Sequence, residues 1–100
     1  MGETGASNRI LRLIAEAEAE PSALPRILGV MHTLAVVPIR VCVRRLEDRL
    51  LCAQIDFTGL GDATMTRLVV KLRQLTCVVE ATWYAMPQAA PHQVLQSADT

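Results

Sequence analysis

The sequence predicts an α+β fold in which four strands and two helices follow one another in the order βαββαβ. Two observations predict it. In four segments apolar residues alternate with polar ones at a period of two, the pattern of a strand with one buried face. In two further segments apolar residues recur every three or four positions, the stripe of an amphipathic helix. All six segments lie between Ile10 and Met86 of a chain of 100 residues, so each element is short.

The first predicted strand has apolar residues at the odd positions from 11 to 19. The period changes after Pro21, and a helical stripe follows. The stripe consists of Leu24, Ile27, Leu28, Met31 and Leu34. Ser22 is placed to cap this helix, and Pro25 falls in its first turn, where a missing N–H has no intrahelical partner to lose.

Two further strands form a predicted hairpin. Their alternating apolar residues are Ile39, Val41 and Val43 in the first strand, and Leu51, Ala53, Ile55 and Phe57 in the second. Both sets are odd-numbered, and we expect both to be buried. Opposed residues must then have position numbers with an even sum, because a slip of one residue would turn one set outward. This parity favours a three- or five-residue loop over a two-residue loop.

The segment Thr58-Gly59-Leu60-Gly61 ends the hairpin, and Asp62 can cap a second helix. The stripe of that helix is Met65, Leu68, Val69, Leu72 and Leu75, and the last strand buries Val79, Ala81 and Trp83. With right-handed crossovers this order predicts a four-stranded antiparallel sheet in the order 4-1-3-2, with both helices on one face. Such a βαββαβ sandwich is the ferredoxin-like fold, which does not by itself indicate a function.

Composition excludes several classes of protein. Ten basic and ten acidic residues leave no formal charge, which argues against nucleic acid or an anionic membrane as a partner. No apolar run approaches the roughly 20 residues of a membrane helix, and Met1 to Ser7 lack the pattern of a secretion signal. The three cysteines, Cys42, Cys52 and Cys77, have no metal-ligand spacing and indicate reduced thiols. We therefore expect a cytoplasmic protein.

We expect one domain over residues 9–86, with disordered ends at residues 1–8 and 87–100. Such a small domain buries little surface, so stabilisation by self-association is expected. The second strand is an edge without proline or glycine to block pairing with another chain. We therefore expect a homodimer that pairs along Ile39, Arg40, Val41, Cys42 and Val43.

The sequence lacks the motifs that other proteins of this fold use for metal binding or catalysis. The loop after the first strand has no cysteine for a soft metal, and the only asparagine is Asn8. We interpret Gly59-Leu60-Gly61 as a turn and His32 as a surface residue. Cys42 and Cys52 would be directly opposed under a three-residue loop, and we interpret them as half-buried thiols. No paired acid and base can be assembled, so we expect no catalytic residue, no cofactor and no metal.

The junction of the first strand and helix reads Ala19-Glu20-Pro21-Ser22-Ala23-Leu24-Pro25-Arg26-Ile27-Leu28-Gly29. It resembles the N-x-P-G-x-L-x-R-[IV]-x-G stretch that opens many ACT domains, which are small amino-acid-sensing modules. It looks most like the regulatory subunit of acetohydroxyacid synthase (acetolactate synthase). The similarity continues through Ile39 to Arg45 and through Lys71 to Ala81, a segment similar to K-L-x-K-L-x-D-V-x-x-V. The chain resembles the short, ACT-only form of that subunit over about residues 10–84.

The resemblance implies a ligand site. In the family, an asparagine and a glycine of the first loop, and a glycine and an asparagine after the first helix, bind a feedback amino acid across a dimer interface. The matching residues here are Ala19, Ser22, Ala35 and Val37, with Glu20, Ala23 and Leu24 beside them. None of the four keeps the family residue. Backbone N–H groups at Ser22 and Ala23 can still receive a carboxylate, but the lost side-chain hydrogen bonds argue against feedback binding.

Two functions follow as hypotheses. The first is a non-catalytic regulatory or accessory subunit of a thiamine-diphosphate-dependent acetolactate synthase in branched-chain amino-acid biosynthesis. It would act by dimerisation and by contact with the catalytic subunit. The alternative is a free-standing ACT sensor that binds an amino acid or another small ligand at the dimer interface.

Overall fold

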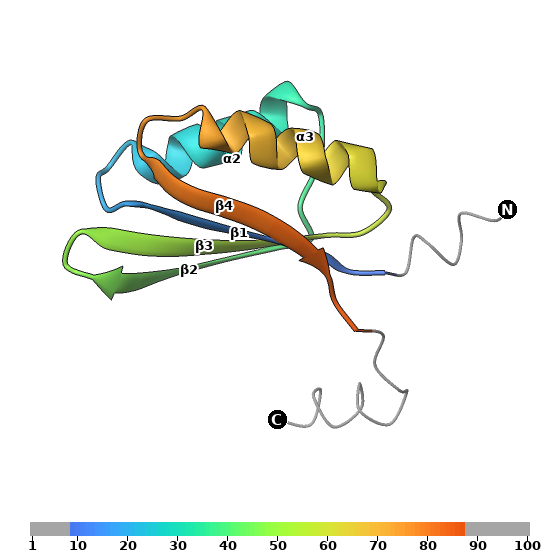
Figure 1. Cartoon of the computed structure of the whole chain (residues 1–100), viewed down its shortest axis with the longest axis horizontal. Coiled ribbons are helices and arrows are strands. Elements are labelled where there is room, and N and C mark those ends of the chain that lie inside the picture. The colour runs from blue at the N-terminus through green and yellow to red at the C-terminus, as the bar shows by residue number, and fades with distance from the viewer. Residues whose placement is uncertain (1–8, 88–100) are drawn as a thin grey trace, which may run out of the picture.

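The computed structural model describes residues 9–87. Its elements are β1 (Leu11–Glu18), α2 (Ala23–Thr33), β2 (Arg40–Glu47), β3 (Leu50–Phe57), α3 (Asp62–Arg73) and β4 (Val78–Ala85). The strands form one antiparallel sheet in the order β2-β3-β1-β4, and both helices lie on the same face of it (Figure 1). The predicted ferredoxin-like fold is confirmed. The disorder expected at residues 1–8 and 87–100 falls, except for Pro87, outside the described residues.

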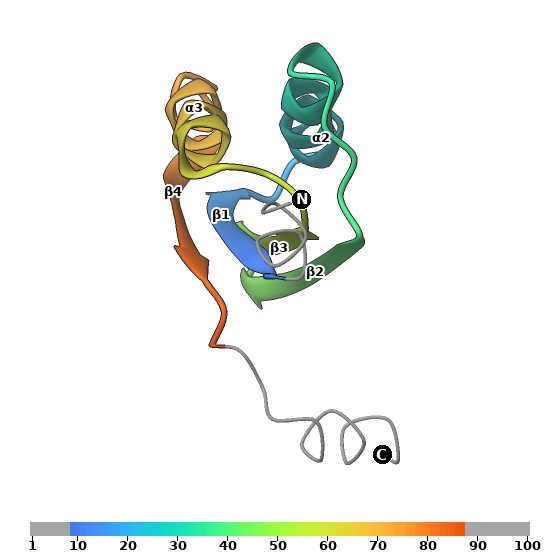
Figure 2. The same ribbon diagram turned by 90° about the vertical axis from the view of Figure 1, so that its right-hand side faces the viewer.

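The core lies between the central strands and the two helices, which sit side by side on the sheet (Figure 2). Leu13, Ala15 and Ala17 of β1 have no exposed surface, as their alternation predicts. Ala15 is opposite Ala53 on β3 and Ala81 on β4, and these two are also fully buried. The small side chains of this row leave room for larger residues of the helices, since interiors are close-packed.

The helix α3 buries the stripe that its sequence predicts, except that Leu75 is only half-buried. Gly61 is its N-cap residue, so the expected cap, Asp62, is instead the first helical residue.

On α2 the buried residues are Ala23, Ile27, Val30 and Met31, while the expected Leu24, Leu28 and Leu34 are half-buried. The apolar stripe is therefore rotated toward Ala23 and Val30. A period of three to four residues does not show which of two adjacent rows of a helix meets the sheet.

The hairpin has the predicted even register, but its turn is shorter than expected. Val41 is opposite Ile55, and Val43 is opposite Ala53, so the sums are even. The turn, however, has only two residues, Asp48 and Arg49, and the expectation of a three- or five-residue loop is wrong. An irregularity of register between Arg45 and Glu47 leaves Leu46 without a partner. This bulge supplies the extra residue that a two-residue turn lacks.

The expectation that the apolar residues of β2 are buried is also wrong. Ile39, Val41 and Val43 are 56%, 41% and 40% exposed. Val41 and Val43 point to the helix face, because their partners on β3 are buried there. The strand is the outermost one, however, and α2 does not cover its outer side. Sequence alternation predicted the face correctly but could not show whether that face had a cover.

A second bulge changes the start of β4. Glu16 is opposite Glu80, but Ala17 is opposite Val78, so Val79 has no partner in the register. Val79 is 58% exposed, and the prediction that it is buried is wrong. Val78, which strict alternation with Val79 would place on the opposite face, packs against the core instead.

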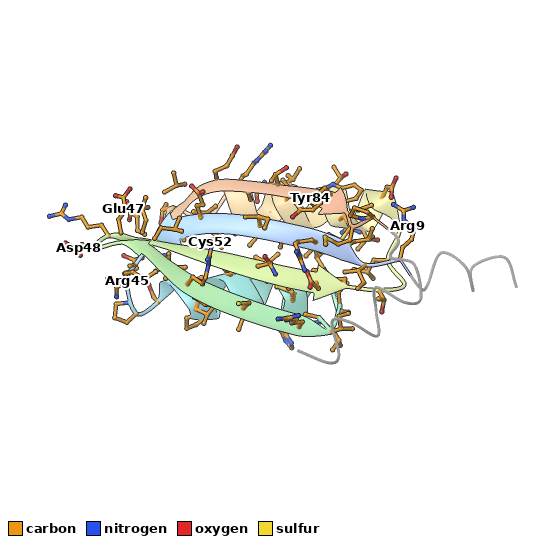
Figure 3. All side chains as sticks on the ribbon, turned by 90° about the horizontal axis from the view of Figure 1, so that it is seen from below. Arg9, Arg45, Glu47, Asp48, Cys52 and Tyr84 are labelled. Atoms are coloured by element: carbon orange, nitrogen blue, oxygen red, sulfur yellow. The ribbon has the colours of Figure 1, made fainter. Side chains whose placement is uncertain are left out.

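The open face of the sheet, seen in Figure 3, carries a nearly buried ion pair. Arg12 Nε donates to Asp56 Oδ1 at 2.8 Å, and Arg12 Nη2 donates to Asp56 Oδ2 at 3.0 Å. The side chains are 19% and 4% exposed, respectively. The bonds to Asp56 raise the pKa of the Arg12 guanidinium above its ordinary value. Burial opposes the shift, and Tyr84, opposite Arg12 on β4, adds to it. The pair ties β1 to β3 from the side away from the core.

Replacing Asp56 by alanine should lower the free energy of unfolding by about 3 kcal/mol, because it leaves the Arg12 charge largely buried without its partner. Urea denaturation measures the change. As a control, Glu47→Ala removes an exposed carboxylate of β2 and should change stability by less than about 0.5 kcal/mol.

The double variant Arg12→Met/Asp56→Leu should recover most of the stability lost, because an apolar pair of similar volume leaves no unpaired charge. A double variant as unstable as Asp56→Ala would contradict this account of the ion pair.

Candidate ligand-binding and dimerisation site

The loop between β1 and α2 is tied to the hairpin turn. The N–H of Ala19 donates to the carbonyl of Arg49 at 2.8 Å. An open cleft of about 300 Å³ lies at this end of the sheet, lined by Glu18, Ala19, Glu20, Asp48 and Arg49. Three carboxylates against one guanidinium make the cleft acidic. It therefore suits an amino group better than a carboxylate.

Two of the predicted ligand residues, Ala19 and Glu20, line this cleft, while Ser22, Ala23 and Leu24 do not. Sequence reasoning missed its other three residues. One topological signal could have found them: β1 and β3 pair antiparallel, so the end of β1 must lie beside the turn that precedes β3.

At the start of α2 the expected carboxylate donors are partly occupied. The N–H of Ala23 donates to the carbonyl of Glu20 at 3.0 Å, and Ala23 is fully buried. Ser22 is at the predicted N-cap position, but its side chain makes no capping bond. Its Oγ lies 3.3 Å from Glu20 Oε2 in a hydrogen bond instead. This helix start therefore presents fewer free donors than the sequence suggested.

Ala35, beyond the end of α2, has a φ of 57°, in the left-handed region that glycine favours. The N–H of Ala35 donates to the carbonyl of His32 at 3.1 Å, and the N–H of Val36 donates to that of Met31 at 3.0 Å. These two bonds form a Schellman motif, in which this position is usually glycine. The resemblance implies a glycine at this position, and the backbone here has a conformation suited to glycine.

The two halves of the implied ligand site lie at opposite ends of α2. Ala19 to Leu24 surround its start, whereas Ala35 and Val37 follow its end. An eleven-residue helix is about 16 Å long at 1.5 Å per residue. Val37 is 83% exposed and lies outside the cleft. One chain therefore does not bring the two halves together, and a shared pocket would need a second copy.

The predicted dimer edge is an open strand edge beside an apolar strip. We call Ile39, Val41 and Val43 the β2 strip. The N–H of Ile39 donates to Asp56 O on β3 at 2.8 Å. The carbonyl of Arg49 accepts from Ala19 on the β1 side, so by alternation the even-numbered residues of β3, Asp56 included, face β2. Their partners in the register are Arg40, Cys42 and Arg44, so the N–H and C=O groups of Val41 and Val43 point away from the sheet. They are available to another strand.

Cys42 and Cys52 lie on the open face but are not directly opposed. Cys42 is opposite Gln54, and Cys52 is opposite Arg44, because the bulge set a different register from that of a three-residue loop. Diagonal neighbours are about 7–8 Å apart, too far for a disulfide without backbone movement. Both thiols are free and half-buried.

Within residues 9–87, no group of three His, Cys, Asp or Glu side chains is arranged to hold a metal ion. In the same part of the chain, no helix is long and apolar enough to cross a membrane.

Comparison with known proteins identifies the family. Residues 6–90 match a family described as ACT-like domain. The chain belongs to the ACT-like domain family. The ACT part of the sequence resemblance is thereby confirmed, and the acetolactate synthase part stays a prediction. ACT domains are typically regulatory, and they commonly dimerise and bind amino acids. A search of curated proteins found no match for this chain.

Several solved structures share the fold. The ACT domain from GTP pyrophosphokinase of Chlorobium tepidum has a TM-score of 0.65 and 15% identity, over 75% of this chain and 96% of that one. The C-terminal domain of the MgtC protein from Mycobacterium tuberculosis has a TM-score of 0.60 and 17% identity, over 85% and 95%. A homoserine dehydrogenase from Thiobacillus denitrificans has a TM-score of 0.63 and 10% identity, over 83% of this ACT-like chain and 19% of that chain. These likenesses concern the fold.

The variant Ala35→Gly should raise the free energy of unfolding by about 0.5–1 kcal/mol. Glycine removes the roughly 1–2 kcal/mol penalty of a left-handed alanine, and part of that gain is offset by the greater freedom of glycine in the unfolded chain. Thermal and urea denaturation measure the change.

The matched control is the opposite exchange within α2. At Gly29 an added Cβ meets no atom within 4 Å, so Gly29→Ala should also stabilise by about 0.5–1 kcal/mol through helix propensity. Loss of stability in Ala35→Gly would show that the left-handed backbone is not the determining factor.

Proposed function

We propose that this ACT-like domain is a non-catalytic regulatory module that works as a homodimer joined along β2. We further propose that it serves as the accessory subunit of a cytoplasmic, thiamine-diphosphate-dependent acetolactate synthase in branched-chain amino-acid biosynthesis. The observation that carries the proposal is the β2 strip, three apolar side chains that are 40–56% exposed beside an open strand edge. Pairing with a second copy would satisfy the backbone groups and cover the strip together.

The side chains of β2 restrict how two copies can pair. In a two-fold antiparallel pair one residue must face its own copy. With Cys42 at the centre, Arg40 would lie opposite Arg44 twice, and directly opposed like charges are destabilising. With Val43 at the centre, Arg45 would lie opposite Val41. With Val41 at the centre, Ile39 lies opposite Val43, and the β2 strip of one copy covers that of the other.

Pairing centred on Val41 also suits the backbone. Val41 carries outward N–H and C=O groups, so it would form a hydrogen-bonded pair with its own copy across the two-fold axis. In a hydrogen-bonded antiparallel pair the Cα atoms are about 5.5 Å apart. We therefore propose Val41 as the centre of the dimer.

We expect a Val41→Cys variant, made with Cys42→Ser, to oxidise readily to a covalent dimer. The expected Cα separation of about 5.5 Å lies within the range of disulfides. The matched control, Val43→Cys with Cys42→Ser, places its thiol opposite Ile39 of the other copy and should form far less covalent dimer. Non-reducing electrophoresis after mild oxidation measures both. Equal cross-linking of the two variants, or a monomeric wild type in sedimentation equilibrium, would contradict this dimer.

The choice of a contact role over feedback sensing rests on the site. The family positions that hydrogen-bond the effector hold Ala19, Ser22, Ala35 and Val37 here, and alanine and valine side chains supply no hydrogen bond. The cleft beside Ala19 is acidic, and it would repel the carboxylate of an amino acid. These features favour a module that acts by touching another protein. The resemblance of the first loop and of Lys71 to Ala81 to the acetolactate synthase subunit supports that enzyme as the partner.

We expect the purified chain to have no acetolactate synthase activity alone and to raise the rate of the catalytic subunit from the same genome. Acetolactate formation, measured with and without the chain, tests this, together with co-elution in size-exclusion chromatography. The Val41→Pro variant, which removes an N–H and should disturb β2, serves as the dimer-deficient comparison. No change in rate and no co-elution would contradict the subunit proposal.

One observation favours the alternative of a free-standing sensor. Ala35 has a left-handed backbone conformation, which suits the glycine that the resemblance implies at this position. The position belongs to one half of the implied ligand site. In a dimer this turn could approach the first loop of the other copy. Calorimetry discriminates the two functions: a saturable heat with a small amino acid would favour the sensor, whereas contact with a synthase would favour the subunit.

A further inference from the structure

We propose that Arg73 and Glu80 close the β4 edge of the sheet against strand addition, so that the chain associates through β2 and stops at a closed dimer. An antiparallel sheet with four strands has two edges, here β2 and β4. Either edge can in principle pair with another chain. The two edges differ in whether their outward backbone groups are already occupied.

At the middle of β4 both outward backbone groups are bound by side chains. The carbonyl of Ala81 accepts hydrogen bonds from Arg73 Nε at 3.1 Å and Arg73 Nη2 at 2.8 Å. The N–H of Ala81 donates to Glu80 Oε1 at 3.1 Å. Arg73 Nε and Glu80 Oε1 are also 3.8 Å apart, which links the two capping groups. We call this arrangement the Ala81 clamp.

Arg73 can reach the edge because it is the last residue of α3, the helix that packs beside β4. Ala81 is opposite Ala15 on β1, and bonds from two guanidinium nitrogens show that its carbonyl points away from that strand. An incoming strand would need these same two groups of Ala81. It would first have to displace both side chains.

The bulge at Val79 lies next to the clamp and interrupts the register on the other side of Glu80. Bulges twist an edge locally and terminate regular pairing. The clamp and the bulge together occupy the first half of β4, from Val78 to Ala81. The remaining positions, 82 to 85, form too short a segment for a long regular pairing.

The β2 edge has no comparable protection. None of the side-chain hydrogen bonds of residues 9–87 is made to the backbone of residues 40–44. The β2 bulge, at Leu46, lies beyond the strip and next to the turn. Two open edges would let each added chain present a new edge and grow an open filament. One open edge allows a two-fold pair that closes.

The test separates the two edges by disabling β2 first. In the Val41→Pro background we expect a chain that is monomeric in sedimentation velocity. Adding Arg73→Ala and Glu80→Ala should restore association, with an average mass that rises with concentration. The matched control adds Lys71→Ala and Glu47→Ala, which remove the same charges from exposed positions outside the clamp, and it should stay monomeric.

In the wild-type β2 background, the clamp variant should form species larger than a dimer, and the same control should not. Circular dichroism establishes that each variant is folded. Should the double variant fail to fold, Arg73→Gln, which loses the two-nitrogen fork, is expected to associate more than wild type. Folded clamp variants that remain monomeric in the Val41→Pro background at every concentration would overturn the proposal.

The clamp rests on contacts of β4, and it does not depend on the proposed β2 dimer. If Val41→Pro associates as strongly as wild type, the β2 dimer is wrong. The clamp is then tested by comparing average masses in the Val41→Pro background. The variant with Arg73→Ala and Glu80→Ala should have a larger average mass than the control with Lys71→Ala and Glu47→Ala. No increase would overturn it.

Discussion

The structure depends on one constraint, that the central strand β1 is paired on both sides and must bury one of its two faces. Leu13, Ala15 and Ala17 meet the helices on one face, with no exposed surface. On the other face Arg12 binds Asp56 of β3 through two hydrogen bonds. A slip of one residue would expose the core set and break the ion pair together. The apolar and the polar face of β1 therefore specify the same register, and the order of the sheet follows from it.

The outer strands meet this register with one bulge each. Leu46 is the inserted residue that gives the hairpin its even register in spite of the two-residue turn. Val79 is the residue without a partner at the start of β4. The helix α3 packs against the edge strand β4 (Figure 2), whereas the apolar side chains of β2 stay exposed. On β4 the side chains of Arg73 and Glu80 occupy the edge. On β2 the apolar strip and the free backbone groups remain, and this asymmetry between the edges underlies both the proposed dimer and its closure.

At the candidate ligand site the backbone has the conformation that the resemblance implies, although the family's side chains are absent. The turn after α2 keeps a left-handed residue and both bonds of a Schellman motif, although the residue is Ala35 and not glycine. The first loop keeps its place beside the hairpin turn, but the cleft there is lined by three carboxylates. Under the proposed function, the scaffold of an amino-acid sensor is retained while its hydrogen-bonding groups are lost. What remains is a surface suited to another chain.

By itself the sequence determined the element order, the sheet order, the buried faces of β1, β3 and α3, and the ACT resemblance, because period and chain direction are local properties that survive in any packing. Arg12 and Asp56 lie at even positions between the apolar residues of their strands, so alternation puts both on the open face. It does not show that they are in contact, since pairing across strands depends on register. Only the tertiary structure decided that the β2 strip is uncovered, that Val78 replaces Val79, and that Arg73 reaches Ala81. Each of these depends on an inserted residue or on a neighbour distant in sequence, and alternation within one strand carries no information about either.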